Sequence, residues 1–199
     1  MTIPSKVTNI GESAFTLCSS LTSVNIPSGV TKICAGTFSD CTSLTSVNIP
    51  YGVTEIGKSA FESCKKLTSV TIPSTITKID RYAFAYCNGI TSIKSYITNV
   101  FETGNKSFDD CLNATLYVPK GLVETYKTTP DWNKISFIKE IPVSYDVNGD
   151  GSVDVSDVVS IVSSVLGTTG DDGEAYDVNT DGKVDVSDVV TLVNVILGK

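Results

Sequence analysis

Residues 10–32 read IGESAFTLCSSLTSVNIPSGVTK, and this pattern returns in step every 23 residues through the first part of the chain. When the copies are aligned, an isoleucine, a phenylalanine and a cysteine recur at fixed places. The three columns are Ile10, Ile33, Ile56 and Ile79, then Phe15, Phe38, Phe61 and Phe84, then Cys18, Cys41, Cys64 and Cys87. A fixed period of this length predicts a solenoid, in which each unit buries its apolar face only by stacking on its neighbours.

The local pattern within one copy predicts a short strand after a turn. Segment 21–26 has apolar residues at its first, fourth and sixth places, which is the spacing of a leucine-rich-repeat strand. Segment 11–18 has apolar residues at its fourth, fifth and eighth places, which indicates a single helical turn with its apolar side inward. Pro27 and Gly29 then predict the turn into the next coil.

The consensus I-G-x-x-A-F-x-x-C-x-x-L-x-x-V-x-I-P resembles the BspA-like leucine-rich repeats found on bacterial surface proteins. This resemblance covers residues 3 to about 141 and implies a leucine-rich-repeat solenoid of short parallel strands and short helical turns. It also implies an extracellular or bacterial cell-surface location. Residues 1–9 match the tail of a copy and not a secretory signal, so we expect the chain to open inside a longer repeat array.

The period breaks down towards residue 141, where a solenoid needs a cap that shields its last coil. We expect residues 1–141 to form the solenoid, with residues 119–141 as its C-terminal cap. Within the cap, residues 123–127 predict a short helix. The apolar cover of the last coil is expected to consist of Trp132, Ile135, Phe137 and Ile138.

The cysteines are interpreted as buried free thiols and not as disulfides. Five of the six, all except Cys34, occupy the same inward place on successive coils. Parallel side chains on adjacent coils do not readily reach the dihedral angle of a disulfide, whereas a buried thiol behaves as a small apolar group. The sequence contains no histidine, which excludes a Cys-His nucleophile and a Cys/His zinc site.

The outward residues of the predicted strands form a ladder of small polar groups. A solenoid uses such an extended face for binding, and hydroxyl and amide groups suit a protein or a glycan ligand equally. Solvated strand residues without a ligand are the alternative interpretation. The candidate positions are Ser23, Asn25, Ser46, Asn48, Ser69, Thr71, Ser92 and Lys94.

The net charge of −7 is concentrated at the C-terminal end. Residues 1–145 carry 11 acidic and 13 basic side chains, whereas residues 146–199 carry 11 acidic and 2 basic ones. This asymmetry argues against nucleic acid, which needs a basic surface, and favours a cation site.

Two acidic loops, DVNGDGSVDVSD at 146–157 and DVNTDGKVDVSD at 177–188, carry oxygen-bearing side chains at places 1, 3, 5, 9 and 12. A glycine holds place 6, and place 7 contributes its backbone carbonyl, which is the arrangement of a calcium loop. The sequence therefore predicts two Ca²⁺ ions. The expected ligands are Asp146, Asn148, Asp150, Ser152, Asp154 and Asp157 in the first loop, and Asp177, Asn179, Asp181, Lys183, Asp185 and Asp188 in the second.

Each loop runs into an apolar helix, predicted over residues 155–166 and 186–197 and ended by Gly167 and Gly198. The doubled loop-helix unit, without an incoming helix, resembles a type I dockerin over residues 144–199, a small all-α fold. We expect the dockerin domain to span residues 142–199.

The dockerin resemblance implies a cohesin module as partner, on a scaffold or a cell-surface protein, as in a cellulosome-like assembly. The recognition positions that it implies are Val155, Ser156, Val162, Ser163, Val186, Ser187, Val193 and Asn194. The alternative is that the valines among them pack the two helices together.

Three functions remain open at this point. The first is a non-catalytic binding protein, in which the solenoid binds a host, bacterial or polysaccharide surface and the dockerin attaches it to a cohesin. The second is a fragment of a polysaccharide-degrading enzyme; the repeats offer no clustered pair of carboxylates, so the chemistry would lie upstream. The third is a dockerin-like module that acts only as a calcium-stabilised cap of the solenoid. We expect the first, and no enzyme activity in this chain.

Overall fold

The computed structural model describes residues 1–111, 113–142, 145, 147, 153–166, 176–181 and 183–198. The chain divides into two compact units, residues 1–140 and residues 141–199, which are described separately. Among the described residues, no helix has the length and apolar character needed to span a lipid bilayer.

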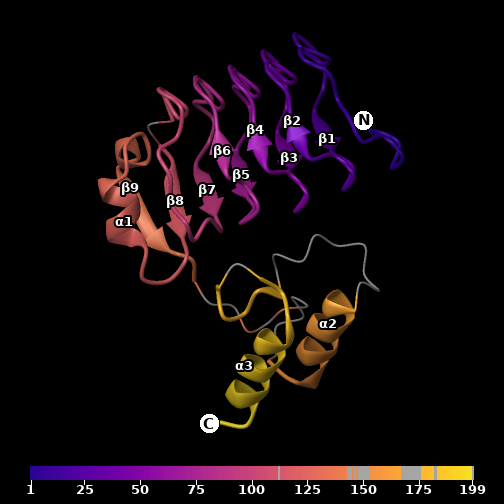
Figure 1. Ribbon diagram of the computed structural model, residues 1–199, viewed down its shortest axis with the longest axis vertical. Helices are drawn as coiled ribbons and strands as arrows, with labels where there is room; N and C mark the ends of the chain where they lie inside the picture. Colours follow the sequence, from indigo (N-terminus) through magenta and orange to yellow (C-terminus); the bar gives the residue numbers. More distant parts are fainter. Residues whose placement is uncertain are drawn as a thin grey trace. The chain divides into compact units, whose positions relative to one another are not determined.

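The first unit is a solenoid of stacked coils whose strands are all parallel (Figure 1). Within each of three parallel sheets a strand pairs with its equivalent on the next coil, as in Ser23 with Ser46 and Ser69 with Ser92. One face carries β1 (Ser23–Asn25), β3 (Ser46–Asn48), β5 (Ser69–Ile72), β7 (Ser92–Ser95), β8 (Thr115–Val118) and β9 (Phe137–Glu140). A second face carries β2 (Lys32–Ile33), β4 (Glu55–Ile56) and β6 (Lys78–Ile79). The predicted solenoid is therefore confirmed.

The segment expected to be a helical turn, residues 11–18, instead forms successive tight turns. Ala14 N–H donates to Gly11 at 3.3 Å and Cys18 N–H donates to Phe15 at 3.2 Å, each closing a four-residue turn. The third residue of each turn, Ser13 and Leu17, has a positive φ, which no right-handed helix allows. Two tight turns in series place the apolar residues at the same spacing as one helical turn does. The spacing alone therefore led to the wrong prediction for residues 11–18.

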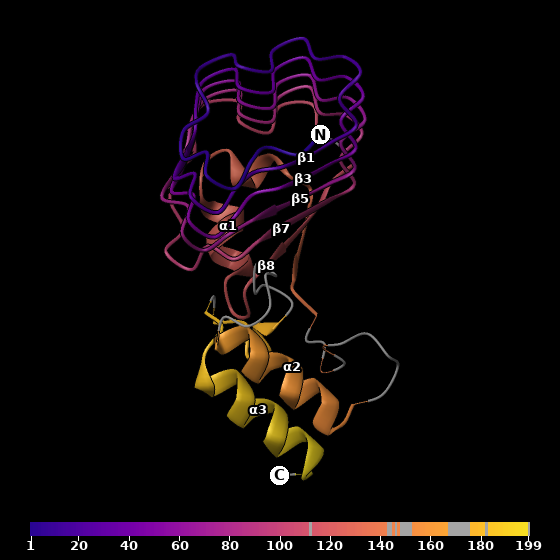
Figure 2. The same cartoon turned by 90° about the vertical axis from the view of Figure 1, so that its right-hand side faces the viewer.

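These left-handed residues recur on every coil and are held by the neighbouring coil. Ser13 N–H donates to Ala35 at 2.9 Å and Leu17 N–H donates to Ser39 at 2.9 Å. The equivalent positive-φ residues are Gly36, Ser59, Tyr82 and Lys106 in the first column, and Asp40, Ser63, Tyr86 and Asp110 in the second. Figure 2 shows the coils superposed along the solenoid, so that the turns lie over one another. Hydrogen bonds to the neighbouring coil therefore stabilise a left-handed backbone conformation that is unfavourable for residues with a Cβ atom.

The phenylalanine column forms a continuous stack through the core. Ring centroids of successive coils lie 5.1 to 5.5 Å apart, with interplanar angles of 10° or less. At the last coil, Phe108 lies 4.8 Å from Trp132, which is fully buried and meets Tyr126 edge-on at 5.1 Å. Trp132 therefore ends the stack as cap core, as predicted.

The cysteine column satisfies backbone groups between coils. The thiol of Cys41 donates to the carbonyl of Phe15 at 3.1 Å, and Cys64 donates to Phe38 at 3.2 Å. On the next two coils, Cys87 donates to the carbonyl of Phe61 and Cys111 donates to the carbonyl of Phe84. Burial raises the pKa of Cys41 to about 12. All six cysteines are free; Cys41, Cys64, Cys87 and Cys111 are buried and Cys18 and Cys34 are partly exposed.

The cap consists of α1 (Val123–Thr128), the 3-10 helix η1 (Trp132–Lys134) and β9. Tyr126 anchors it, because its buried hydroxyl donates to Ile97 at 2.8 Å and shares a hydrogen bond with Ser95. The expectation that Phe137 belongs to the cap core was wrong: its side chain is 59% exposed. Residues 137–140 form a strand, in which successive side chains alternate between two faces, so Ile138 packs on the core while Phe137 points outward.

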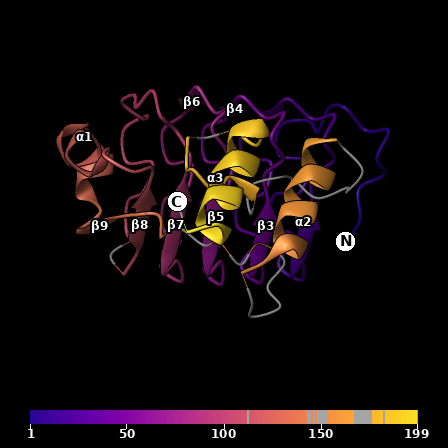
Figure 3. The same cartoon turned by 90° about the horizontal axis from the view of Figure 1, so that it is seen from below.

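The second unit contains α2 (Val155–Val165) and α3 (Val186–Ile196), which lie side by side (Figure 3). Its core consists of Ile161, Val178 and Leu192, with further partly buried apolar side chains around them. Gly198 has a φ of 65° immediately beyond α3, so it ends this helix as predicted. Gly167 lies outside the described residues.

Replacing Trp132 should test the cap. Trp132→Ala removes a fully buried ring and is expected to cost about 3–5 kcal/mol of unfolding free energy. Trp132→Phe keeps a ring on the stack and should cost clearly less. The measurement is urea unfolding followed by circular dichroism, because Trp132 is the only tryptophan. Equal stability of both variants and the wild type would contradict a capping role.

Leu17 tests the strain in the turns, because it is exposed and has a φ of 61°. Leu17→Gly should raise the unfolding free energy by about 1 kcal/mol, since glycine reaches this conformation without a steric penalty. Leu17→Ala keeps the Cβ atom and serves as control; it should leave stability nearly unchanged. A glycine variant less stable than the alanine variant would refute the strain.

Candidate calcium loops and partner-binding surfaces

The second acidic loop is described from Asp177 to Asp188 except at residue 182. Its side-chain oxygens accept hydrogen bonds from backbone N–H groups of the same loop. Asp181 N–H donates to Asp177 Oδ1 at 3.1 Å and to Asn179 Oδ1 at 2.8 Å. Lys183 N–H in turn donates to Asp181 Oδ1 at 2.9 Å. The oxygens at places 1 and 3 thus meet at the backbone N–H of place 5, and the oxygen at place 5 accepts from the N–H of place 7.

Places 9 and 12 of each loop also begin the following helix. Asp185 caps α3 by accepting from Ser187 N–H at 2.8 Å, and Asp188 accepts from Asp185 N–H at 2.9 Å. Asp154 and Asp157 form the same reciprocal capping box on α2. The backbone hydrogen bond from Ser187 lowers the pKa of Asp185, so this carboxylate stays ionised at the helix N-terminus.

The donor set suits a hard cation. Asp188 is fully buried, and its two oxygens accept from the N–H groups of Asn179 and Asp185 at 3.0 and 2.9 Å. No lysine or arginine in the described part of the chain forms an ion pair with Asp188. A buried carboxylate is costly unless a positive charge compensates it, and Ca²⁺ with its preference for oxygen ligands would do so.

The carboxylates do not form a tight cluster. Across the described ranges, no three Asp, Glu, Cys or His side chains come together in a group that could hold a metal ion. Calcium loops also use amide, backbone carbonyl and water oxygens, so the fit depends on the whole loop. In the first loop, four expected ligands lie outside the described residues: Asp146, Asn148, Asp150 and Ser152.

The two helices expose equivalent apolar side chains. Val155 on α2 is 67% exposed, and its counterpart Val186 on α3 is 65% exposed. The alternative that these two valines pack the helices together is therefore wrong; Val158 and Val189 contact the core in their place. Val162 is exposed and Val193 is half-buried; Ser156, Ser187 and Asn194 are exposed, and Ser163 is half-buried.

Further exposed apolar residues on the helices were missed by the sequence reasoning. Val159 and Val190 are exposed one turn after Val155 and Val186. Leu166 and Leu197 are exposed at the equivalent helix ends. The 31-residue period, which relates all of these pairs, is the signal that would have found them.

The predicted ligand face of the solenoid is exposed at its N-terminal end and less so further along. Ser23, Asn25, Ser46, Asn48 and Ser69 are exposed, whereas Thr71, Ser92 and Lys94 are half-buried. The pairing of the strands aligns these side chains in two columns. The same columns continue through Thr115 and Tyr117 on β8 and Phe137 and Lys139 on β9, which the sequence reasoning did not include.

Comparison with protein families identifies the two units. Residues 1–119 match the model of the BspA type leucine rich repeat region in six copies. The chain belongs to this family. Residues 144–197 of this BspA-type chain match the model of the dockerin type I domain. Dockerin type I domains generally bind calcium, and both kinds of domain are non-catalytic and typical of surface or secreted proteins. No curated protein matches the chain significantly.

Solved structures share the solenoid fold. The pneumococcal vaccine antigen PcpA matches with a TM-score of 0.57 and 15% identity over 71% of this chain and 41% of its own. The leucine-rich repeat protein TpLRR of T. pallidum matches with a TM-score of 0.51 and 22% identity over 70% of this chain and 84% of its own. A leucine-rich repeat protein from Bacteroides ovatus is 28% identical, with a TM-score of 0.49, over 72% of this chain. The BspA-type chain spans 40% of that protein's length.

Removing calcium should unfold the second unit alone. We expect a chelator to abolish the circular dichroism of α2 and α3, because metal binding supplies folding free energy for so small a core. Trp132 lies in the solenoid cap, so its fluorescence should not change. Free calcium at a hundred times its Kd should restore about 2.7 kcal/mol of stability.

A pair of double variants controls for charge. Asp146→Ala with Asp177→Ala should reproduce the effect of the chelator. Asp171→Ala with Asp172→Ala removes the same charge outside the two loops and should leave calcium binding intact. If chelation leaves the helical signal unchanged, the loops do not hold calcium.

Proposed function

We propose that this chain is a non-catalytic binding protein with two binding modules. Its solenoid, residues 1–141, holds a protein or glycan through the strand face. Its dockerin module, residues 142–199, folds around two Ca²⁺ ions and docks on a cohesin module of a scaffold or cell-surface protein. The site of action is outside the cell or on the bacterial surface, within a polysaccharide-degrading assembly of the cellulosome kind.

The observation that carries the docking proposal is the duplicated apolar surface of α2 and α3. Val155 and Val186 are exposed to almost the same extent, and Val159 and Val190 repeat this one turn later. Exposed apolar side chains gathered on one small module are typical of a protein interface. Because the surface occurs twice, either helix offers the same set of contacts.

Either helix alone should be sufficient for cohesin binding, so binding should fail only when both helices are changed. Val155→Asp or Val186→Asp alone should weaken binding at most a few-fold, because the other helix remains available. The double variant should lose at least a hundredfold, since each orientation would bury an unpaired charge. The measurement is calorimetry of the calcium-loaded chain against a panel of purified bacterial cohesins.

Leu17→Asp is the matched control, because it adds the same charge at an exposed apolar residue of the solenoid. It should bind cohesin like the wild type. Binding by the double variant as tight as the wild type would disprove docking through these helices. If no cohesin binds and the second unit folds only when joined to the solenoid, the module is instead a calcium-stabilised cap.

A further inference from the structure

The outward side chains of the strand face change character along the solenoid. Each of the six strands presents two outward residues, and those of β1 and β3 are serine and asparagine. At the other end, register places Lys94 beside Tyr117 and Tyr117 beside Lys139. Phe137 lies beside Thr115 in the neighbouring column. We define Lys94, Tyr117, Phe137 and Lys139 as the basic-aromatic patch.

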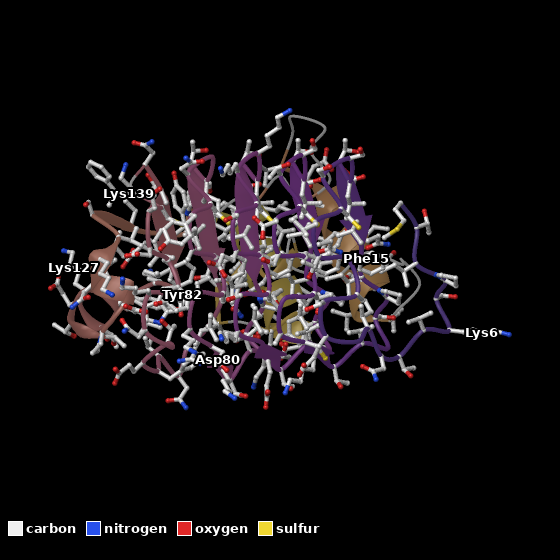
Figure 4. All side chains as sticks on the ribbon, turned by 90° about the horizontal axis from the view of Figure 1, so that it is seen from above. Lys6, Phe15, Asp80, Tyr82, Lys127 and Lys139 are labelled. Atoms are coloured by element: carbon white, nitrogen blue, oxygen red, sulfur yellow. The ribbon has the colours of Figure 1, made fainter. Side chains whose placement is uncertain are left out.

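Basic side chains outnumber acidic ones on this face. Of the 22 acidic residues of the chain, only Glu140 lies on the six strands, at the exposed end of β9. Glu140, at the end of β9, accepts from Gly121 N–H at 2.8 Å. Figure 4 shows Lys139 and Asp80 on opposite sides of the solenoid. The face is therefore complementary to an anionic ligand.

The aromatic side chains add flat apolar surface between the lysines. Phe137 is 59% exposed although it lies on a strand next to the core. Tyr117 is half-buried between two lysine-bearing strands, and neighbouring strands lie about 4.8 Å apart. Rings with one apolar side and adjacent cationic or hydroxyl groups suit a ligand that has both apolar and polar surfaces.

The face offers little to a peptide. Peptides that bind sheets place alternate side chains into pockets. Here the residues between the outward ones, Val70, Ile93 and Leu116, are buried in the core and leave no room for insertion. The outward neighbours Ser69, Ser92 and Thr115 instead supply a row of hydroxyl groups along the solenoid axis.

We infer that the basic-aromatic patch binds an acidic polysaccharide, with the lysines pairing with its carboxylates and the rings of Phe137 and Tyr117 lying against its sugars. This inference rests on the proposal that the strand face is the ligand-binding surface. It names the ligand class and moves the centre of binding from the serine and asparagine end to β7, β8 and β9.

The test uses the calcium-loaded full chain and three soluble polymers: hyaluronan as acidic polysaccharide, hydroxyethyl cellulose as neutral polysaccharide and poly-L-glutamate as acidic peptide. Affinity electrophoresis and calorimetry should show binding to hyaluronan at least tenfold tighter than to either other polymer. Lys94→Gln with Lys139→Gln should weaken it at least tenfold, and Phe137→Ser at least threefold. Lys58→Gln with Lys65→Gln removes the same charge elsewhere and should change it less than twofold.

Each other result overturns the inference in a distinguishable way. If both lysine double variants lose the same affinity for hyaluronan, the polymer is attracted by the overall charge of the solenoid and not by the patch. Tighter binding of poly-L-glutamate would assign the face to an acidic peptide. Equal binding of hydroxyethyl cellulose, with no effect of the lysine variants, would leave a glycan-binding face but refute the acidic ligand. Binding of none of the polymers would refute the patch, while the cohesin measurement would still decide the docking proposal.

Discussion

The structure of the solenoid depends on a register of 23 residues between neighbouring coils. Polar groups and rings of one coil meet their partners on the neighbouring coil. Leu17 N–H reaches Ser39, the ring of Phe15 stacks on Phe38, and the thiol of Cys41 reaches the carbonyl of Phe15. A shift of one residue would break all three contacts together, because each belongs to a different column of the same repeat. The cap is needed for the same reason, since Trp132 takes the place of the next phenylalanine.

Most of the solenoid was predictable because its period is fixed by burial. The strands that follow the L-x-x-L-x-L spacing and the inward columns follow from apolar spacing, and the buried Trp132 follows from the need for a cap. The two-residue strands β2, β4 and β6 were not predicted. The conformation of residues 11–18 was not predictable, because two tight turns with positive φ and one helical turn bring the same residues inward. Phe137 was misassigned for a related reason. The repeat ends before β9, so no aligned column indicates which residues of this segment point inward.

The calcium loops and the partner-binding surfaces differ in how completely the sequence predicted their residues. Loop spacing predicted the calcium ligands residue by residue, because a cation needs oxygens at set places of a short segment. The proposed partner-binding surfaces were harder to predict. Val159 and Val190 carry the same residue type as core valines, and only exposure separates them. The basic-aromatic patch joins β7, β8 and β9, whose outward residues share no motif and meet only through strand pairing.

The cysteine column has a consequence for where this protein can remain folded. Thiols that are buried, bonded to carbonyls and, in Cys111 as in Cys41, shifted to a pKa of about 12 hold almost no thiolate at neutral pH. The thiolate is the species that oxidants and disulfides attack. Small exported domains commonly rely on disulfide bonds, which reductants break. In this solenoid stacked rings and the hydrogen bonds of four buried thiols hold neighbouring coils together, and these contacts need no oxidising surroundings.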